Sequence, residues 1–220
     1  MIDLEKAVAQ YELDLHTCLH IGAHHGQEDA TYQSLGIEPI YVEANPQAYQ
    51  VLVQRLPGRE CHQTAIADFI GQVDFHVTSN EQSSSILPLK KHKKIYPHIL
   101  AERTIRVDCT TVDGLLGPRC CNIDLLNMDI QGAELKALQR ATHTLPGIQC
   151  IVTEINRTEL YAGCALVRDL DRFLRPYGFR RAITVCPYHR SWGDALYVKS
   201  PALSLSRRCW PFSGRRSASA

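Results

Sequence analysis

Short apolar runs alternate with segments of helical periodicity along most of the chain, the pattern of a mostly parallel sheet covered by helices. The apolar runs predict strands near 17–21, 39–43, 60–64, 125–130 and 150–155. The helical pattern predicts an N-terminal helix through Leu13 and further helices near 27–35, 46–56, 133–142 and 166–174. We therefore expect an α/β fold.

Two regions depart from this alternation. Residues 73–77 and 105–109 alternate polar and apolar positions, which predicts a small inserted antiparallel β-pair, within an insert over about 72–110. Residues 179–185 and 195–199 predict a final antiparallel hairpin that turns through 191–194. We expect one domain over residues 1–200, followed by a basic, disordered tail over 201–220.

The turn after the first predicted strand carries two glycines, Gly22 and Gly26, and the second strand ends in an acid, Glu43. Glycines let a backbone approach a ligand, and an acid at this place can bind both ribose hydroxyls. The three-glycine dinucleotide fingerprint is absent, so S-adenosylmethionine, whose ribose has no phosphate beside it, fits better than a dinucleotide. The alternative is that the glycines only shape a tight turn and Glu43 is a solvated strand end.

Composition narrows the class of partner and the compartment. The chain has 220 residues and a net charge of +1, but four arginines and no acid fall in 201–220, leaving residues 1–200 at −3. That balance argues against nucleic acid. No apolar run approaches the roughly 20 residues of a membrane span, and the first residues lack the order of a signal peptide. The nine cysteines are scattered without a C-x-x-C pair, so we expect a cytoplasmic protein and assign no metal ligand.

Several motifs, in order over about residues 16–199, resemble the FkbM-type methyltransferase family. They are His-Ile-Gly-Ala-His-His-Gly at 20–26, Val-Glu-Ala-Asn-Pro at 42–46, Ala-Ile-Ala-Asp at 65–68 before Gly71, Ser-Ser-Ser-Ile-Leu at 83–87, Thr-Thr-Val-Asp at 110–113, and 124–134. The resemblance implies a class I methyltransferase (Rossmann-like) fold and S-adenosyl-L-methionine as cofactor. It also implies O-methylation of a hydroxyl on a small molecule, a natural product or a sugar. A non-catalytic S-adenosylmethionine-binding module and an RNA methyltransferase are the alternatives.

Three positions depart from the family pattern. His20 stands where the family usually has an acid that orients the methionine amino group, and Glu28 is the candidate to replace it. Asn127 and Gln131 stand where a lysine and a glutamate are usual, which suggests that a neutral pair replaces an ion pair.

The predicted site combines a cofactor-binding set with a smaller catalytic set. Asp129, directly after a buried strand, is the first catalytic candidate, with capping of the next helix as its alternative role. His24 and His25 are alternative bases, or they only bond within the turn. The residues predicted to bind the methyl donor are Gly22, Ala23, His24, Gly26, Glu28, Glu43, Ala44, Asn45, Ala65, Ser84, Ser85 and Asp129.

The acceptor end of the site is less defined. His189 and Asp194 lie near the final hairpin, which often borders the acceptor in this family. The basic run at 90–94 is interpreted as solvated surface, with an anionic acceptor as the alternative. The expected acceptor is a small molecule or a glycan, and the pattern sets no oligomeric state.

Overall fold

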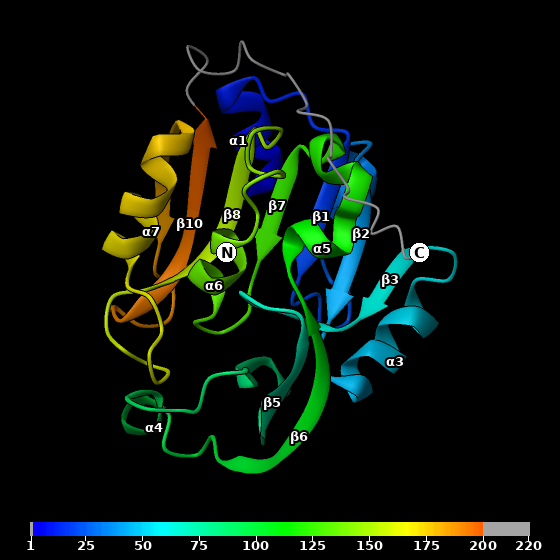
Figure 1. Ribbon diagram of the computed structural model, residues 1–220. Coiled ribbons are helices and arrows are strands. Elements are labelled where there is room, and N and C mark those ends of the chain that lie inside the picture. Colours follow the sequence, from blue (N-terminus) through cyan, green and yellow to red (C-terminus); the bar gives the residue numbers. More distant parts are fainter. Residues whose placement is uncertain (1, 200–220) are drawn as a thin grey trace, which may run out of the picture.

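The computed structural model describes residues 2–199, and its centre is a seven-stranded sheet (Figure 1). The strand order is β3-β2-β1-β7-β8-β10-β9, and β10 runs antiparallel to both of its neighbours while the other pairs are parallel. The predicted fold class, a mostly parallel open sheet with a C-terminal antiparallel hairpin, is confirmed. The strands are β1 (Thr17–Ile21), β2 (Glu38–Glu43), β3 (Glu60–Gln63), β7 (Leu125–Met128), β8 (Cys150–Asn156), β9 (Phe179–Val185) and β10 (Trp192–Lys199).

Helices cover both faces of this sheet, because the side chains of its central strands alternate between two apolar cores. Leu19 and Ile21 of β1 pack into the core under α5, α6 and α7, whereas Cys18 packs into the core under α1, α2 and α3. The helices are α1 (Leu4–Tyr11), α2 (Asp29–Ser34), α3 (Pro46–Arg55), α5 (Val112–Leu116), α6 (Glu134–Gln139) and α7 (Val167–Leu174), with 3₁₀ turns η2 (Gly117–Asn122) and η3 (Arg175–Tyr177). Figure 1 shows α5 and α6 in front of the sheet.

The inserted region forms the predicted antiparallel pair, and a short strand before the insert adds a third member to this second sheet. Its order is β4-β6-β5, from β4 (Ala65–Ile66), β5 (Gly71–Thr78) and β6 (Ala101–Thr110). The short β4 pairs parallel to β6 and has no sequence signal, because two residues show no periodicity. Between β5 and β6 the chain passes through η1 (Glu81–Ser83) and α4 (His92–Ile95).

The final hairpin turns earlier than predicted. Strand β10 begins at Trp192, so residues 186–191 form the turn and the predicted turn at 191–194 is wrong. Gly193 suggested the turn, but it lies in the strand opposite Ile155 of β8. A Cβ at Gly193 would lie 2.1 Å from the backbone oxygen of Val185, so this glycine permits a close approach of two strands.

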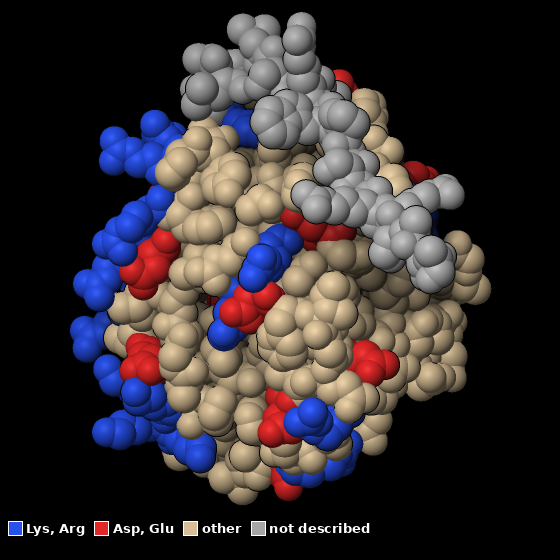
Figure 2. Space-filling model, viewed as in Figure 1, with Lys and Arg blue, Asp and Glu red and all other residues tan. Residues whose placement is uncertain are grey.

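Basic side chains gather along one side of the molecule, at the left margin of Figure 2, where Figure 1 places α7. Exposed arginines there include Arg168 and Arg172 on α7 and Arg180 and Arg181 on β9. Because β9 is an edge strand, charged side chains on it disfavour pairing with another chain. No helix in residues 2–199 is long and apolar enough to cross a membrane, and the predicted tail at 201–220 lies outside the described residues.

Candidate functional site

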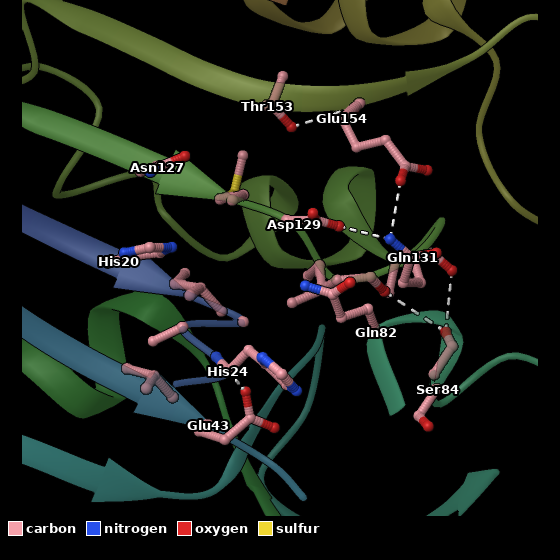
Figure 3. A pocket seen from close by; sticks show the side chains of 18 of the residues that line it. His20, His24, Glu43, Gln82, Ser84, Asn127, Asp129, Gln131, Thr153 and Glu154 are labelled. Carbon is pink, nitrogen blue, oxygen red and sulfur yellow. Dashed lines mark hydrogen bonds between the residues drawn. The ribbon is translucent and has the colours of Figure 1, made fainter. Parts of the chain in front are cut away.

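A cavity of about 760 Å³ opens at the carboxyl ends of β1, β2 and β7. The strand order reverses between β1 and β7, and ligands of open α/β sheets bind at such a reversal. Figure 3 shows His24, Glu43, Asp129 and Gln131 projecting toward one another from these strand ends. Of the predicted site residues, those that line the cavity are Gly22, Ala23, His24, Glu28, Glu43, Ala44, Asn45, Ala65, Ser84, Ser85 and Asp129.

The two glycines of the turn are needed for packing. Gly22 has φ +81°, and a Cβ there would lie 1.9 Å from the backbone oxygen of Asp129. Gly26 has φ +68°, and a Cβ there would meet Leu56 and Leu52 of the α3 region at 2.5 and 2.9 Å. Gly26 does not line the cavity, so its predicted ligand contact is corrected to a packing role against α3. His25 is also outside the lining.

Glu43 is held rigidly at the end of β2. Only 7% of the residue is exposed, and its carboxylate accepts hydrogen bonds from the backbone N–H groups of His24 and Asn45, each at 2.7 Å. Burial raises the pKa of Glu43, while these N–H groups oppose that rise. The alternative of a solvated strand end is therefore wrong, and the carboxylate faces the cavity with its orientation fixed.

Asp129 belongs to a hydrogen-bonded network of four side chains. The Gln131 amide donates to Asp129 Oδ1 at 2.5 Å and to Glu154 Oε2 at 2.8 Å, and its oxygen accepts from the Tyr161 hydroxyl. Asp129 is exposed toward the cavity, but protein surrounds it on its other sides. This burial raises the pKa of Asp129 and the nearby acids raise it further, while the Gln131 amide opposes the rise. A carboxyl of raised pKa is suited to accept a proton near neutral pH.

Asp129 does not have its alternative structural role, capping of the next helix, because α6 has Ala133 at its N-cap and no side-chain cap bond. The Glu134 side chain accepts from the backbone N–H groups of Ile130 and Gly132, at 3.2 and 3.0 Å. Asp129 makes its side-chain bond to Gln131 instead, so nothing in this geometry assigns it to the helix.

The predicted neutral pair of Asn127 and Gln131 does not form, because the two side chains bind different partners. His20 and Asn127 lie opposite each other on β1 and β7, and Tyr32 connects them. Asn127 donates to the Tyr32 hydroxyl at 2.7 Å, and that hydroxyl lies 3.2 Å from Nδ1 of His20. Burial lowers the pKa of His20 to about 4, so this side chain is neutral at neutral pH. Glu28 lines the same cavity, and burial raises its pKa.

The serine hydroxyls are already used by the protein. Ser84 Oγ accepts from the backbone N–H of Thr78 at 3.1 Å, and Ser85 Oγ donates to the backbone oxygen of Gln131 at 2.9 Å. The first bond lies within the inserted region, and the second ties that region to the loop after β7. Both serines line the cavity, and their first role is to shape it.

An aromatic cluster at the cavity had no sequence signal of its own. Tyr188, 77% exposed, stacks on Trp192 with ring centroids 5.7 Å apart, and Trp192 Nε1 donates to the Tyr96 hydroxyl at 3.0 Å. All three line the cavity, as does Asp194. His189 instead accepts from the backbone N–H of Ser191 within the turn.

The basic run at 90–94 lies mostly outside the cavity. Its four lysines are exposed and absent from the lining, and Lys90 pairs with Glu159 at 2.6 Å. His92 is the exception, because it is buried and lines the cavity.

The fold and the cavity together define a class: α/β transferases that bind a nucleoside-containing methyl donor at the carboxyl edge of the sheet. The sequence pattern of the methyltransferase FkbM domain matches residues 20–181. The chain belongs to this family, as its motifs predicted, and S-adenosyl-L-methionine is the methyl donor of the class.

Individual relatives are more distant. The 2-O-methyltransferase NoeI of Sinorhizobium fredii is 31% identical over 109 residues, which cover 46% of this chain and 45% of that protein. The alignment thus spans less than half of this relative. Among solved structures, magnesium protoporphyrin IX methyltransferase (ChlM) from Synechocystis has 11% identity and a TM-score of 0.48, covering 90% of this chain and 78% of that one. TrmK of M. capricolum has 9% identity and a TM-score of 0.46, covering 90% and 68%.

Proposed function

We propose that this protein transfers a methyl group from S-adenosyl-L-methionine to a hydroxyl oxygen of a small molecule, a natural product or a sugar. The observation that carries the proposal is the convergence of Glu43 and Asp129 in one cavity at the strand reversal, in a chain of the FkbM family. The cytoplasmic location predicted from the cysteines stays a prediction.

The residues at the ends of β1 and β2 suit the nucleoside end of the methyl donor. Glu43 faces the cavity as a fixed hydrogen-bond acceptor, which suits two ribose hydroxyls. Asn45 uses its side-chain oxygen to cap α3, and its Nδ2 is buried without a hydrogen-bond partner among residues 2–199. Such an orphaned donor is costly unless a ligand pairs with it. Glu28, in the lining near neutral His20, supplies the negative charge that a methionine ammonium group needs.

Bound there, the methyl donor supplies an electrophilic methyl group, so the protein must orient an acceptor oxygen and take its proton. Asp129 is the group placed for the proton, because it faces the cavity and its raised pKa suits that task. Gln131 is a positioning residue that fixes the Asp129 carboxyl through the 2.5 Å bond. In the balanced step the acceptor oxygen would form an O–C bond while the sulfonium S–C bond breaks and S-adenosylhomocysteine leaves. Asp129 would take the proton from the broken O–H bond.

The aromatic cluster at the cavity supports a sugar or another ring as acceptor. Tyr188 is largely exposed beside Trp192, and flat apolar faces of this kind pack against the C–H faces of a sugar ring. The exposed lysines lie outside the lining, so the alternative of RNA methylation gains no support from the site. The buried polar groups that depart from the family pattern are hydrogen bonded, so the alternative of a non-catalytic module gains none either.

The test is methyl transfer with mass-spectrometric detection. The purified protein is first titrated calorimetrically with S-adenosylhomocysteine, and is then incubated with S-adenosyl-L-methionine bearing a deuterated methyl group and a panel of glycosides and phenols. We expect saturable binding and a labelled O-methyl ether, which Asp129→Asn should form at least about 100-fold more slowly. Binding without transfer to any acceptor in fractionated extracts would favour the binding module. Label recovered in RNA would favour the other alternative, and no binding at all would refute the proposal.

A further inference from the structure

Two histidines of the glycine turn and one glutamate of the inserted region form a compact cluster. His24 and His25 follow β1, and Glu81 begins η1. The two imidazole rings are stacked, with centroids 3.7 Å apart and planes 24° apart. Their Nε2 atoms lie 3.4 and 3.9 Å from the same atom, Oε2 of Glu81.

The backbone is built to bring adjacent histidines to one side. Neighbouring side chains of an extended chain point in opposite directions, but His24 has φ +46°, in the left-handed region that side chains other than glycine rarely adopt. That conformation costs about 1–2 kcal/mol. The bond from the His24 N–H to Glu43 holds this backbone in place, so the two imidazoles stay close together. Their rings would turn out of the stack to bring both Nε2 lone pairs to one ion.

The polar atoms of this cluster are not satisfied by one another. His24 Nε2 is buried and has no hydrogen-bond partner among residues 2–199, because its 3.4 Å approach to Glu81 lacks hydrogen-bond alignment. The Gln27 amide lies 3.0 Å from Nδ1 and orients the ring through that nitrogen. The buried Nε2 of His24 thus lies close to a second imidazole and a carboxylate and has no hydrogen-bond partner among residues 2–199.

We propose that His24, His25 and Glu81 bind a divalent transition-metal ion of the zinc type. Their ligand atoms all lie within 4.8 Å of one another. Bonds of about 2.0–2.2 Å at tetrahedral angles separate two ligands by roughly 3.3–3.5 Å, close to the distances observed. Two imidazoles and one carboxylate suit Zn²⁺ or Co²⁺, whereas Mg²⁺ and Ca²⁺ prefer oxygen ligands. The lack of paired cysteines, which argues against a thiolate site, does not bear on a histidine site.

The ion would connect two parts of the cavity wall. The histidines belong to the turn of the large sheet, and Glu81 belongs to the segment between β5 and α4. Because His24 and Glu81 line the cavity, an ion held by them would be accessible from it. Gln27 Nε2 lies 3.0 Å from His24 Nδ1. A metal-bound imidazole donates its second N–H, so on ion binding the Gln27 amide would turn to present its oxygen to Nδ1–H. The cluster shares the cavity of the proposed methyl donor, but metal binding is measured without methyl donor or acceptor, so the two proposals fail separately.

The experiment uses Co²⁺ as a spectroscopic probe of the full chain after treatment with a chelator. We expect saturation at one ion per chain, with visible ligand-field bands of a four-coordinate site and without the intense near-ultraviolet bands of a thiolate ligand. Zn²⁺ should displace the Co²⁺. Because outer-shell changes alone weaken metal sites by about 10–100-fold, loss of a ligand in Glu81→Gln or His25→Gln should weaken binding by at least about 100-fold.

The control is His62→Gln, because His62 also lies close to a carboxylate, 2.8 Å from Glu60, but outside the cluster. This variant should bind as the parent does. Circular dichroism establishes that each variant is folded, and Glu81 is 40% exposed, so its replacement by an isosteric amide leaves the core untouched. Absence of saturable binding, thiolate bands, or equal binding by the parent and both ligand variants would overturn the proposal.

Discussion

The Gln131 amide lets two carboxyl groups lie side by side, and its replacement by a carboxyl tests that role. In the parent it donates to Asp129 at 2.5 Å and to Glu154 at 2.8 Å. Gln131→Glu keeps size and shape, removes both donated bonds, and adds a third acid where burial already raises two pKa values. Glutamate is the residue that is usual at this position in the family. Any loss of stability in Gln131→Glu must therefore come from the neighbours of position 131 in this chain.

The magnitude follows from the two bonds. Each hydrogen bond to a charged group contributes about 1.5–3 kcal/mol, so their loss predicts a destabilisation of about 3–6 kcal/mol at pH 8. At roughly 2–4 °C per kcal/mol for a chain of this size, Tm should fall by at least about 6 °C. The bond from the Tyr161 hydroxyl survives, because a carboxylate oxygen also accepts it.

The effect should depend on pH with a defined sign. The new carboxyl has a pKa of about 4.3 in the unfolded chain, and burial with two acidic neighbours raises its pKa in the folded state. As the pH rises above about 4.3, the unfolded chain releases a proton that the folded chain retains, so folding becomes less favourable. The destabilisation relative to the parent is therefore smaller at pH 5 than at pH 8.

Urea unfolding followed by circular dichroism at pH 5 and pH 8 measures this for the parent, Gln131→Glu and Gln131→Met. The methionine variant loses the same bonds without adding a charge, so it separates the two contributions and should lack the additional pH dependence. A folded Gln131→Glu variant within about 1 kcal/mol of the parent at pH 8 would show that the amide does not hold the two acids together.

Three further predictions concern the ends of the site. Asp129→Asn keeps an oxygen that can accept from Gln131, so stability should hold while kcat falls about 100-fold or more; near-parental turnover would remove Asp129 from the chemistry. Glu43→Gln should weaken calorimetric binding of S-adenosylhomocysteine by about 1.5–3 kcal/mol, whereas Glu38→Gln, at the exposed start of the same strand, should not; equal affinities would refute the ribose assignment. The last change replaces the four exposed lysines of the basic run by Gln, at Lys90, Lys91, Lys93 and Lys94. It should leave KM and its salt dependence unchanged, and a raised KM with a flatter salt response would instead indicate an anionic acceptor.

The strands could be predicted from the sequence because parallel strands buried on both faces are continuous apolar runs. The sequence patterns mispredict local structure where tertiary contacts determine it. Gly193 has the composition of a turn, but the approach of Val185 makes it a strand residue. The helix predicted to start at residue 27 begins at Asp29 and the one predicted to end at 142 ends at Gln139, because turn geometry replaces periodicity at element ends.

Some residues of the site could likewise be predicted from the sequence, and others are placed only by tertiary contacts. Glu43 and Asp129 could be predicted because each stands directly after an apolar run, and strand ends of a parallel sheet meet at one edge. The partners of Asp129 could not, since Glu154 and Tyr161 lie 25 and 32 positions farther along the chain and meet it only through Gln131. The sequence also gives no signal for Glu81, because its place beside two histidines depends on how the inserted sheet packs.

The glycine turn shows why a correct motif can be correct for a different physical reason. Gly22 predicts the site, but the contact that excludes a side chain there is the backbone oxygen of Asp129, which would lie 1.9 Å from a Cβ at this position. Without that close approach, the ends of β1 and β7 would separate, and the backbone N–H of Asp129 could not reach the oxygen of Ile21 at 3.0 Å. The glycine therefore sets the distance between the turn that we propose binds the methyl donor and the acid that we propose takes the acceptor's proton. At Gly22, the glycine that marks the motif in the sequence is therefore also the glycine that the packing of β1 against β7 requires.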